Sequence, residues 1–90
     1  MPKTNQFADI LPTVHLNGTS RKMLQEGYDA VDDALHELFE AWGKVEFNAR
    51  DYYVKGPEAW EKARETRIEM SKRIREIQEY VNAHREHLYA

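Results

Sequence analysis

Apolar residues recur at steps of three and four along the C-terminal third of the chain, which is the spacing of one face of an α-helix. This face is formed by Trp60, Ala63, Arg67, Met70, Ile74, Ile77, Val81, His84 and Leu88. Gly56-Pro57 precedes it, and proline is favoured at the first position of a helix, where its missing N–H costs nothing. The pattern predicts a long helix over 57–88, with Arg67 as the strong charge on its apolar face.

A second helical pattern lies upstream of the first. Its apolar positions are Leu24, Tyr28, Val31, Leu35, Leu38, Trp42 and Val45. Asn17-Gly18 predicts a turn, and the hydroxyl of Thr19 or Ser20 can accept a hydrogen bond from the first turn of a helix. We therefore expect a helix over 20–45, followed by a connection over 46–56 that lacks helical periodicity.

The two apolar faces can pair in an antiparallel hairpin. The expected pairs are Trp42 with Ala63, Leu38 with Arg67, Val31 with Ile74, and Leu24 with Val81. A charge between helices is costly unless it is paired. We expect Arg67 either to pair with Asp33, Glu37 or Glu40, or to face a pocket between the helices, where it can bind an anion.

Residues 1–19 are predicted to form an extended, non-helical arm. Pro2 and Pro12 bracket most of it, and its apolar anchors are Phe7, Ile10, Leu11, Val14 and Leu16. The arm either covers a helical seam or forms a strand that a second chain completes. Because two helices leave much of their surface wet, we expect one all-α domain: a long two-helix hairpin with this arm, assembled as a homo-oligomer, a dimer or higher.

Composition excludes several classes of function. The chain has 90 residues, no cysteine and a formal charge of −3. It therefore has no disulfide, thiolate nucleophile or cysteine-bound zinc, which fits a reducing cytoplasm. No apolar run is long enough for a signal peptide or membrane span, and no positive field draws long nucleic acid. We expect a cytoplasmic protein that binds neither a membrane nor long nucleic acid.

One candidate binding site lies at the start of the first helix. His15, Asn17, Thr19, Ser20 and Arg21 combine free N–H groups, hydroxyls and a cation, which together favour an anion. The glycine spacing differs from that of a phosphate-binding loop of the GxxxxGK[ST] kind. The alternative is an ordinary capped helix with solvated cations.

A second candidate site lies in the connection. Arg50 can hold a phosphate, and Tyr52 or Tyr53 can stack on a base. Adjacent tyrosines cannot share one face, so we expect one of them to pack inward. The alternative is a loop held in place by its aromatic residues, or a contact with a partner protein.

The two candidate sites fall at opposite ends of one hairpin. A helix of this length spans roughly 38 Å, so the sites meet only across a subunit boundary or if the arm folds back. An antiparallel two-fold dimer would place each connection beside the partner's helix start.

Catalytic and metal-binding patterns are weak. The pairs Asp33/His36 and His84/His87 have helical spacing, but a di-iron bundle needs Glu-x-x-His motifs with facing glutamates. There is no HExxH motif and no Ser/His/Asp signature. We therefore expect a non-enzymatic protein that uses no metal and no cofactor.

Two motifs carry a resemblance to known proteins. The segment LPTVHLNGTS (residues 11–20) and the connection RDYYVKGP (residues 50–57) resemble a group of small phage and prophage helical proteins. The resemblance implies a phage accessory protein in the cytoplasm of a bacterial host, and carries over no assigned activity. By analogy, small helical phage proteins often counter host defence, by blocking a protein or by sequestering a nucleotide signal.

The sequence thus predicts a protein that binds a small anionic ligand of the nucleotide class, cyclic nucleotides included. The alternative is an interaction module that docks and inhibits a host protein, or that serves as a phage structural or assembly factor.

Overall fold

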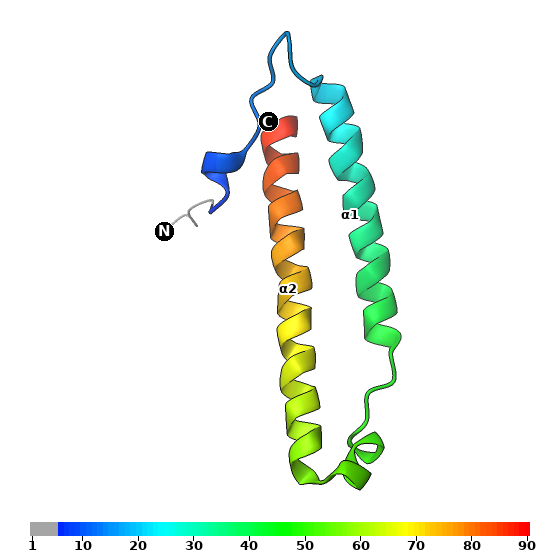
Figure 1. The fold of residues 1–90 in the computed structure, drawn as a ribbon. Coiled ribbons are helices and arrows are strands. Elements are labelled where there is room, and N and C mark those ends of the chain that lie inside the picture. Colours follow the sequence, from blue (N-terminus) through cyan, green and yellow to red (C-terminus); the bar gives the residue numbers. More distant parts are fainter. Residues whose placement is uncertain (1–5) are drawn as a thin grey trace.

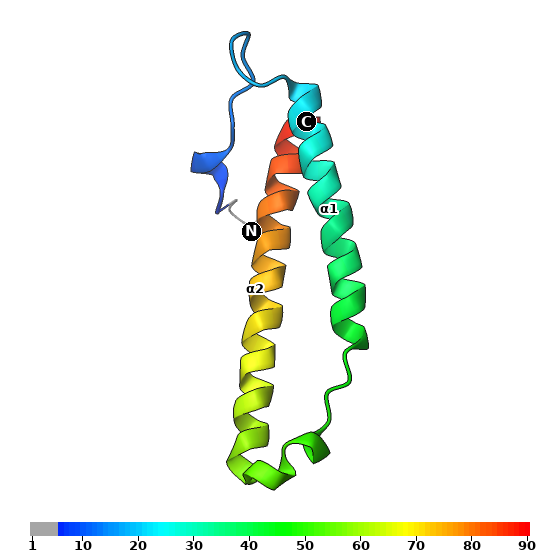
Figure 2. The ribbon, with the colours of Figure 1, turned by 45° about the vertical axis from the view of Figure 1, so that its right-hand side comes forward.

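The computed structural model describes residues 6–90, and within this range it contains helices and turns but no strand. Helix α1 (Arg21–Lys44) and helix α2 (Pro57–Tyr89) run antiparallel, side by side (Figures 1 and 2). Short 3-10 helices are η1 (Ala8–Ile10) in the arm, and η2 (Ala49–Asp51) and η3 (Tyr53–Lys55) in the connection. The predicted all-α helical hairpin is confirmed.

The helix starts follow from local chemistry. The Ser20 hydroxyl accepts a hydrogen bond from the Met23 N–H at 3.1 Å, which satisfies one of the unpaired donors of the first turn of α1. Helix α2 starts at Pro57, after Gly56, whose φ of 103° lies in the region that glycine adopts at little cost. Gly56 therefore sets the angle at which the chain enters α2.

The predicted register between the helices is wrong. The Trp42 indole N–H donates to the Ser71 hydroxyl at 2.8 Å, so Trp42 lies beside Ser71 rather than Ala63. At the other end the Gln25 amide donates to the Leu88 carbonyl oxygen at 2.9 Å, whereas Leu24 was expected opposite Val81. The helices are displaced by roughly two turns.

The connection explains this displacement. It continues past the end of α1 through η2 and η3 before α2 begins (Figure 1). The overhanging start of α2 packs on the connection instead of on α1: the Trp60 ring lies 4.9 Å from that of Phe47 and 5.7 Å from that of Tyr52, centroid to centroid. A shift of two turns presents the same face of each helix, so apolar periodicity alone cannot distinguish the two registers.

The buried core lies at the end of the hairpin away from the connection. Its residues are Asp32, Leu35, Val81, Ala83, His84 and Leu88. The His84 ring contacts the rings of Tyr28 and Tyr80, both tilted against it, at centroid distances of 4.6 and 4.2 Å. Its Nδ1 donates to the Tyr80 carbonyl oxygen at 2.8 Å. The polar ring is therefore accommodated by aromatic faces and a hydrogen bond.

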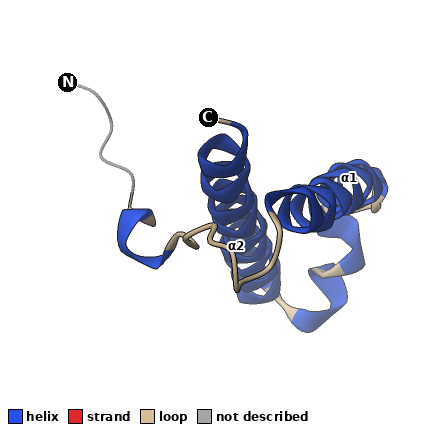
Figure 3. Ribbon diagram, turned by 90° about the horizontal axis from the view of Figure 1, so that it is seen from above, coloured by secondary structure: helices blue, strands red, loops and turns tan. Residues whose placement is uncertain are grey.

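The arm lies against the side of α2 that faces away from α1 (Figure 3). The Phe7 ring meets the edge of Tyr80 at 5.4 Å, and the His87 imidazole donates to the Pro12 carbonyl oxygen at 2.6 Å. Two of the predicted apolar anchors are wrong. Leu16 is 99% exposed, because the chain reverses at 16–18 and leaves the helices there, and Ile10, at the end of η1, is also exposed. Residues 1–5, which include Pro2, lie outside the described part.

Candidate anion-binding groove

A groove with a cationic wall lies beside α2, next to the connection. Its lining is Phe47, Arg64, Arg67, Ile68, Ser71, Lys72 and Arg75, and its volume is about 600 Å³. The lining contains four cationic side chains and no carboxylate. We call it the cationic groove.

Helical spacing places most of these residues on one wall. Arg64, Ile68, Lys72 and Arg75 follow one another at steps of four, four and three, which keeps them on one face of α2. Arg67 and Ser71 stand at the edge of this face nearest α1, as their contacts with Trp42 show. One helix thus supplies the charge, and the connection supplies Phe47.

Arg67 is held in a defined position. Its guanidinium donates to the Trp42 carbonyl oxygen at 2.8 Å, and it lies 4.6 Å from the Trp42 ring centroid and 5.0 Å from that of Phe47. The same carbonyl accepts from the Val45 N–H at 3.3 Å, so Arg67 adds a charged second donor at the C-terminal end of α1. The expected pairing with Asp33, Glu37 or Glu40 is wrong: within residues 6–90 no ion pair includes Arg67. Arg67 lines the groove instead.

Ser71 is fixed by two hydrogen bonds. Its hydroxyl donates to the Arg67 carbonyl oxygen at 3.0 Å and accepts from the Trp42 indole at 2.8 Å. Trp42 therefore fixes the Ser71 side chain, which lines the groove beside Arg67.

The remaining cations of the groove have no carboxylate partner among the described residues. An i,i+4 ion pair on this stretch of α2 joins Glu69 and Arg73 at 3.6 Å, and neither of them lines the groove. Glu79, four residues after Arg75, accepts a hydrogen bond from Gln6 at 3.1 Å and forms no ion pair with Arg75 within the described residues.

A second groove, of about 570 Å³, lies on the other side of Arg67 and Phe47. Cations on its wall are Lys55, Lys62 and Arg67, and Tyr52 and Trp42 supply aromatic surface. Arg67 and Phe47 belong to both grooves. The connection end of the hairpin therefore gathers cations from α2 and η3 around a few aromatic rings.

The N-terminal candidate residues occupy the turn before α1 and its first positions. His15, Asn17 and Thr19 are exposed, and Ser20 is engaged with Met23. The Arg21 guanidinium donates to the Leu88 carbonyl oxygen at 2.6 Å, so it completes the end of α2. Sequence reasoning missed this structural use of Arg21, which depends on the hairpin register.

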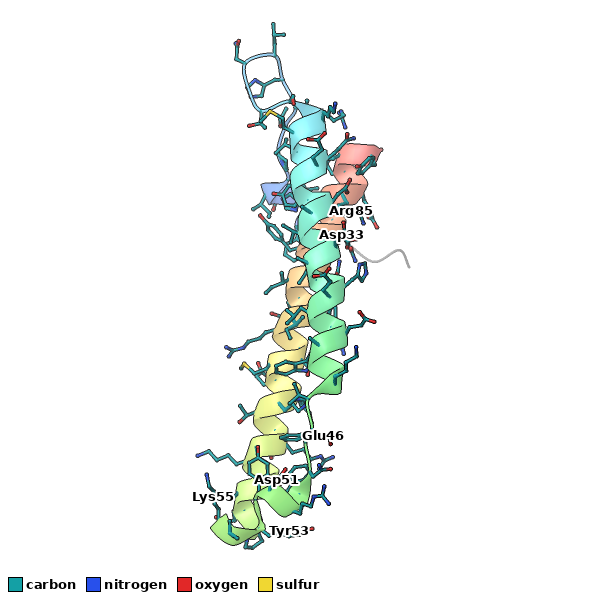
Figure 4. All side chains as sticks on the ribbon, turned by 90° about the vertical axis from the view of Figure 1, so that its right-hand side faces the viewer. Asp33, Glu46, Asp51, Tyr53, Lys55 and Arg85 are labelled. Atoms are coloured by element: carbon teal, nitrogen blue, oxygen red, sulfur yellow. The ribbon has the colours of Figure 1, made fainter. Side chains whose placement is uncertain are left out.

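The connection candidates divide as expected between inside and outside. The Tyr52 ring packs on Phe47 and Trp60, at 5.8 and 5.7 Å, and Tyr53 and Arg50 are exposed. The expectation that one tyrosine packs inward is confirmed. Figure 4 shows Tyr53 and Lys55 at the connection end of the molecule, whose longest extent is 61 Å. A single chain therefore does not bring the two predicted sites together.

Arg64, Ser71, Lys72 and Arg75 were not predicted as site residues. Their spacing along one face of a helix is visible in the sequence and was the available signal. It was not decisive, because charged residues at such spacing are common on solvated helix faces. Only the position of Phe47, from the connection, shows that this face borders a groove.

A polar cluster joins the helices away from the groove. Arg85 donates to Asp29 at 2.8 Å and lies 3.3 Å from Asp32, and the Tyr89 hydroxyl donates to Asp29. These hydrogen bonds from Tyr89 and Arg85 lower the pKa of Asp29. The cluster is saturated by its own members, so it aligns the helices and offers no open binding site.

Other types of site are not supported within the described part of the chain. It contains no group of three or more metal-ligating side chains, and none of its helices has the length and apolar character needed to cross a bilayer. No protein-family model, curated protein or solved structure matches the chain. Its function is therefore inferred from its own residues.

Proposed function

We propose that the protein binds a small anionic ligand without converting it, and that the ligand belongs to the nucleotide class. The observation that carries the proposal is the cationic groove, where Arg64, Arg67, Lys72 and Arg75 share one wall without a carboxylate among its lining residues. Unbalanced cations that converge on a concave surface attract an anion and raise its local concentration.

The chemistry of the wall favours a ligand with phosphate and aromatic parts. Arg67 is positioned in advance by Trp42, so little freedom is lost when it binds a phosphate oxygen. Phe47 and Ile68 offer apolar surface on which a base can stack. From Arg64 to Arg75 the wall extends roughly 16 Å along the axis of α2, which is long enough for more than one phosphate group.

The residues predicted from sequence enter the proposal as a second set of contacts. These residues are His15, Asn17, Thr19, Ser20, Arg21, Arg50, Tyr52 and Tyr53. Tyr52 already lines the groove beside the cationic one.

We place this activity in the cytoplasm of a bacterial host, as that of a phage accessory protein. The motifs LPTVHLNGTS and RDYYVKGP support the setting. Sequestering a cyclic nucleotide or another nucleotide signal of host defence needs tight binding and no chemistry, which suits a site without an acid–base pair.

Titration calorimetry with cyclic dinucleotides, ATP and pyrophosphate tests the proposal. We expect Lys72→Glu and Arg75→Glu each to weaken binding by tenfold or more, since each turns an attraction for phosphate into a repulsion. Arg73→Glu is the matched control: it makes the same charge change on the same helix, outside the groove, and should leave the affinity within about twofold. Absence of binding by the unaltered protein, or equal losses in all three variants, would reject the groove.

A second candidate function has its own supporting observation. Large apolar side chains remain exposed on both helices, among them Val31, Leu38 and Ile77. An interaction module that docks a host or virion protein would use such a surface. It would form a stable complex with that protein and show no thermal shift with nucleotides.

A further inference from the structure

Each helix separates polar from apolar residues about the line of contact between them. On α1, Leu35 is buried at the contact, Asp32 lies to one side of it, and Val31 and Leu38 lie to the other. On α2, Val81 is buried at the contact, with Gln78 to one side and Met70 and Ile77 to the other. This follows from the 100° turn per residue of an α-helix.

The two apolar rows lie on the same side of the hairpin. Asp32 accepts a hydrogen bond from Gln78 at 2.9 Å, which marks one side of the contact as polar on both helices. Since Val31 and Leu38 are turned away from Asp32, and Met70 and Ile77 from Gln78, the two rows share the opposite side. We call these four residues the apolar side.

The apolar side is too exposed for a finished core. Val31, Leu38 and Ile77 are 42%, 41% and 52% exposed. The chain exposes 7400 Å² in all, whereas a compact monomer of its mass exposes about 5,500 Å². The excess is about twice what each partner buries in a protein–protein interface of standard size, roughly 800 Å².

We propose that the apolar side is the surface through which two copies of this chain pair, in an antiparallel arrangement about a two-fold axis. Met70 and Ile77 flank Arg73, the central residue of α2, so the apolar side spans the middle of the hairpin. A surface that straddles the middle of an elongated molecule is self-complementary under a two-fold rotation. Each hairpin then lies along the length of the other, and four helices enclose Val31, Leu38, Met70 and Ile77.

This arrangement joins the two ends that a single chain keeps apart. The turn that carries His15, Asn17 and Arg21 in one copy comes beside the connection that carries Arg50 and Tyr53 in the other. The statement that these residues form one binding site rests on the proposed function. The pairing itself rests on burial and position alone.

Sedimentation equilibrium at micromolar concentration tests the pairing. We expect the unaltered protein to be a dimer or a larger even-numbered assembly, and Leu38→Glu and Ile77→Glu to lower its mass by dissociating the copies. Both positions are half-exposed in one chain, so a glutamate is tolerated there unless a partner covers it. Ile68→Glu is the matched control, because Ile68 is 58% exposed on the groove wall and should leave the mass unchanged.

Circular dichroism separates dissociation from unfolding: the variants should keep at least 80% of the helical signal per residue. If Leu38→Glu unfolds the chain, the milder Leu38→Gln provides the same comparison. A monomeric unaltered protein would overturn the proposal. So would dissociation by Ile68→Glu with no effect of Leu38→Glu and Ile77→Glu.

Cross-linking tests the antiparallel direction, because the chain has no cysteine of its own. Leu16→Cys marks the arm end and Tyr53→Cys the connection end, both at exposed positions. With a short bismaleimide, mixing the two variants should yield mainly cross-linked mixed dimers. Cross-links of Leu16→Cys with itself would show a parallel pair and overturn the arrangement. None of these measurements involves a ligand, so the test of the pairing is independent of whether the cationic groove binds an anion.

Discussion

Single residues at the helix contact act by completing the hydrogen bonds of the opposite helix. Arg67 donates to the Trp42 carbonyl at the end of α1, and Arg21 donates to the Leu88 carbonyl at the end of α2. Arg85 holds Asp29 and Asp32 of α1 from its place on α2. In a hairpin with a small core, such contacts define how the helices align.

Acid should weaken the contact made by Asp29. Its folded-state pKa is lowered from the usual 3.8 by the hydrogen bonds from Tyr89 and Arg85. A lowered carboxyl pKa contributes stability above the unfolded value, and that stability is lost as the pH falls through the folded value. Urea unfolding of Asp29→Asn should show a smaller difference between pH 7 and pH 2.5 than the unaltered protein. Asp33→Asn, at an exposed position of α1, should keep the full difference.

The path of the connection determines the register between the two helices and which side chains lie beside the groove. By extending past α1 as η2 and η3, it shifts α2 by two turns and brings Phe47 beside the cations of α2. The apolar periodicity of each helix was readable from sequence, as were Ser20 at the start of α1 and Pro57 at the start of α2. The length that η2 and η3 add was not, because residues 46–56 have no periodic pattern to read.

Two glycines should respond oppositely to alanine. Gly56 has a φ of 103° and a ψ of 162°, a conformation that strains any side chain, so Gly56→Ala should destabilise the protein by about 1–3 kcal/mol. Gly27 lies inside α1 with open space around its Cα, so Gly27→Ala should stabilise it by about 1 kcal/mol. Thermal and urea unfolding measure both effects. Stabilisation by Gly56→Ala would contradict the structure of this turn.

The whole molecule is an elongated hairpin with its packing concentrated at the two ends. Its radius of gyration is 18.5 Å, against about 12 Å for a compact domain of this length. One end holds Leu35, Val81 and Leu88, and the other holds the rings of Phe47, Tyr52 and Trp60. The apolar side runs along the hairpin from Val31, beside the buried core, toward the connection. If two copies pair through the apolar side as proposed, each chain gains much of its stability from its partner.

The melting temperature should therefore depend on protein concentration. If folding is coupled to pairing, dilution favours the unfolded monomer by mass action. Circular dichroism melts over a hundredfold range of concentration should show the transition moving upward with concentration. The Leu38→Glu variant should melt lower and at one temperature throughout. A melting temperature of the unaltered protein that does not change with protein concentration would contradict this expectation.

The sequence by itself determined the two helices, their apolar faces and their caps, because these depend on contacts within a few residues along the chain. It also singled out Arg67 as a charged residue on an apolar helix face, and left its partner open. The tertiary structure alone decided the register, the partner of Arg67 and the groove. A shift by two turns leaves every helical face where it was, so only the path of the connection and the packing of Trp42, Phe47 and Trp60 distinguish one register from the next. The cations of the groove are ordinary surface residues until that packing places an aromatic wall beside them.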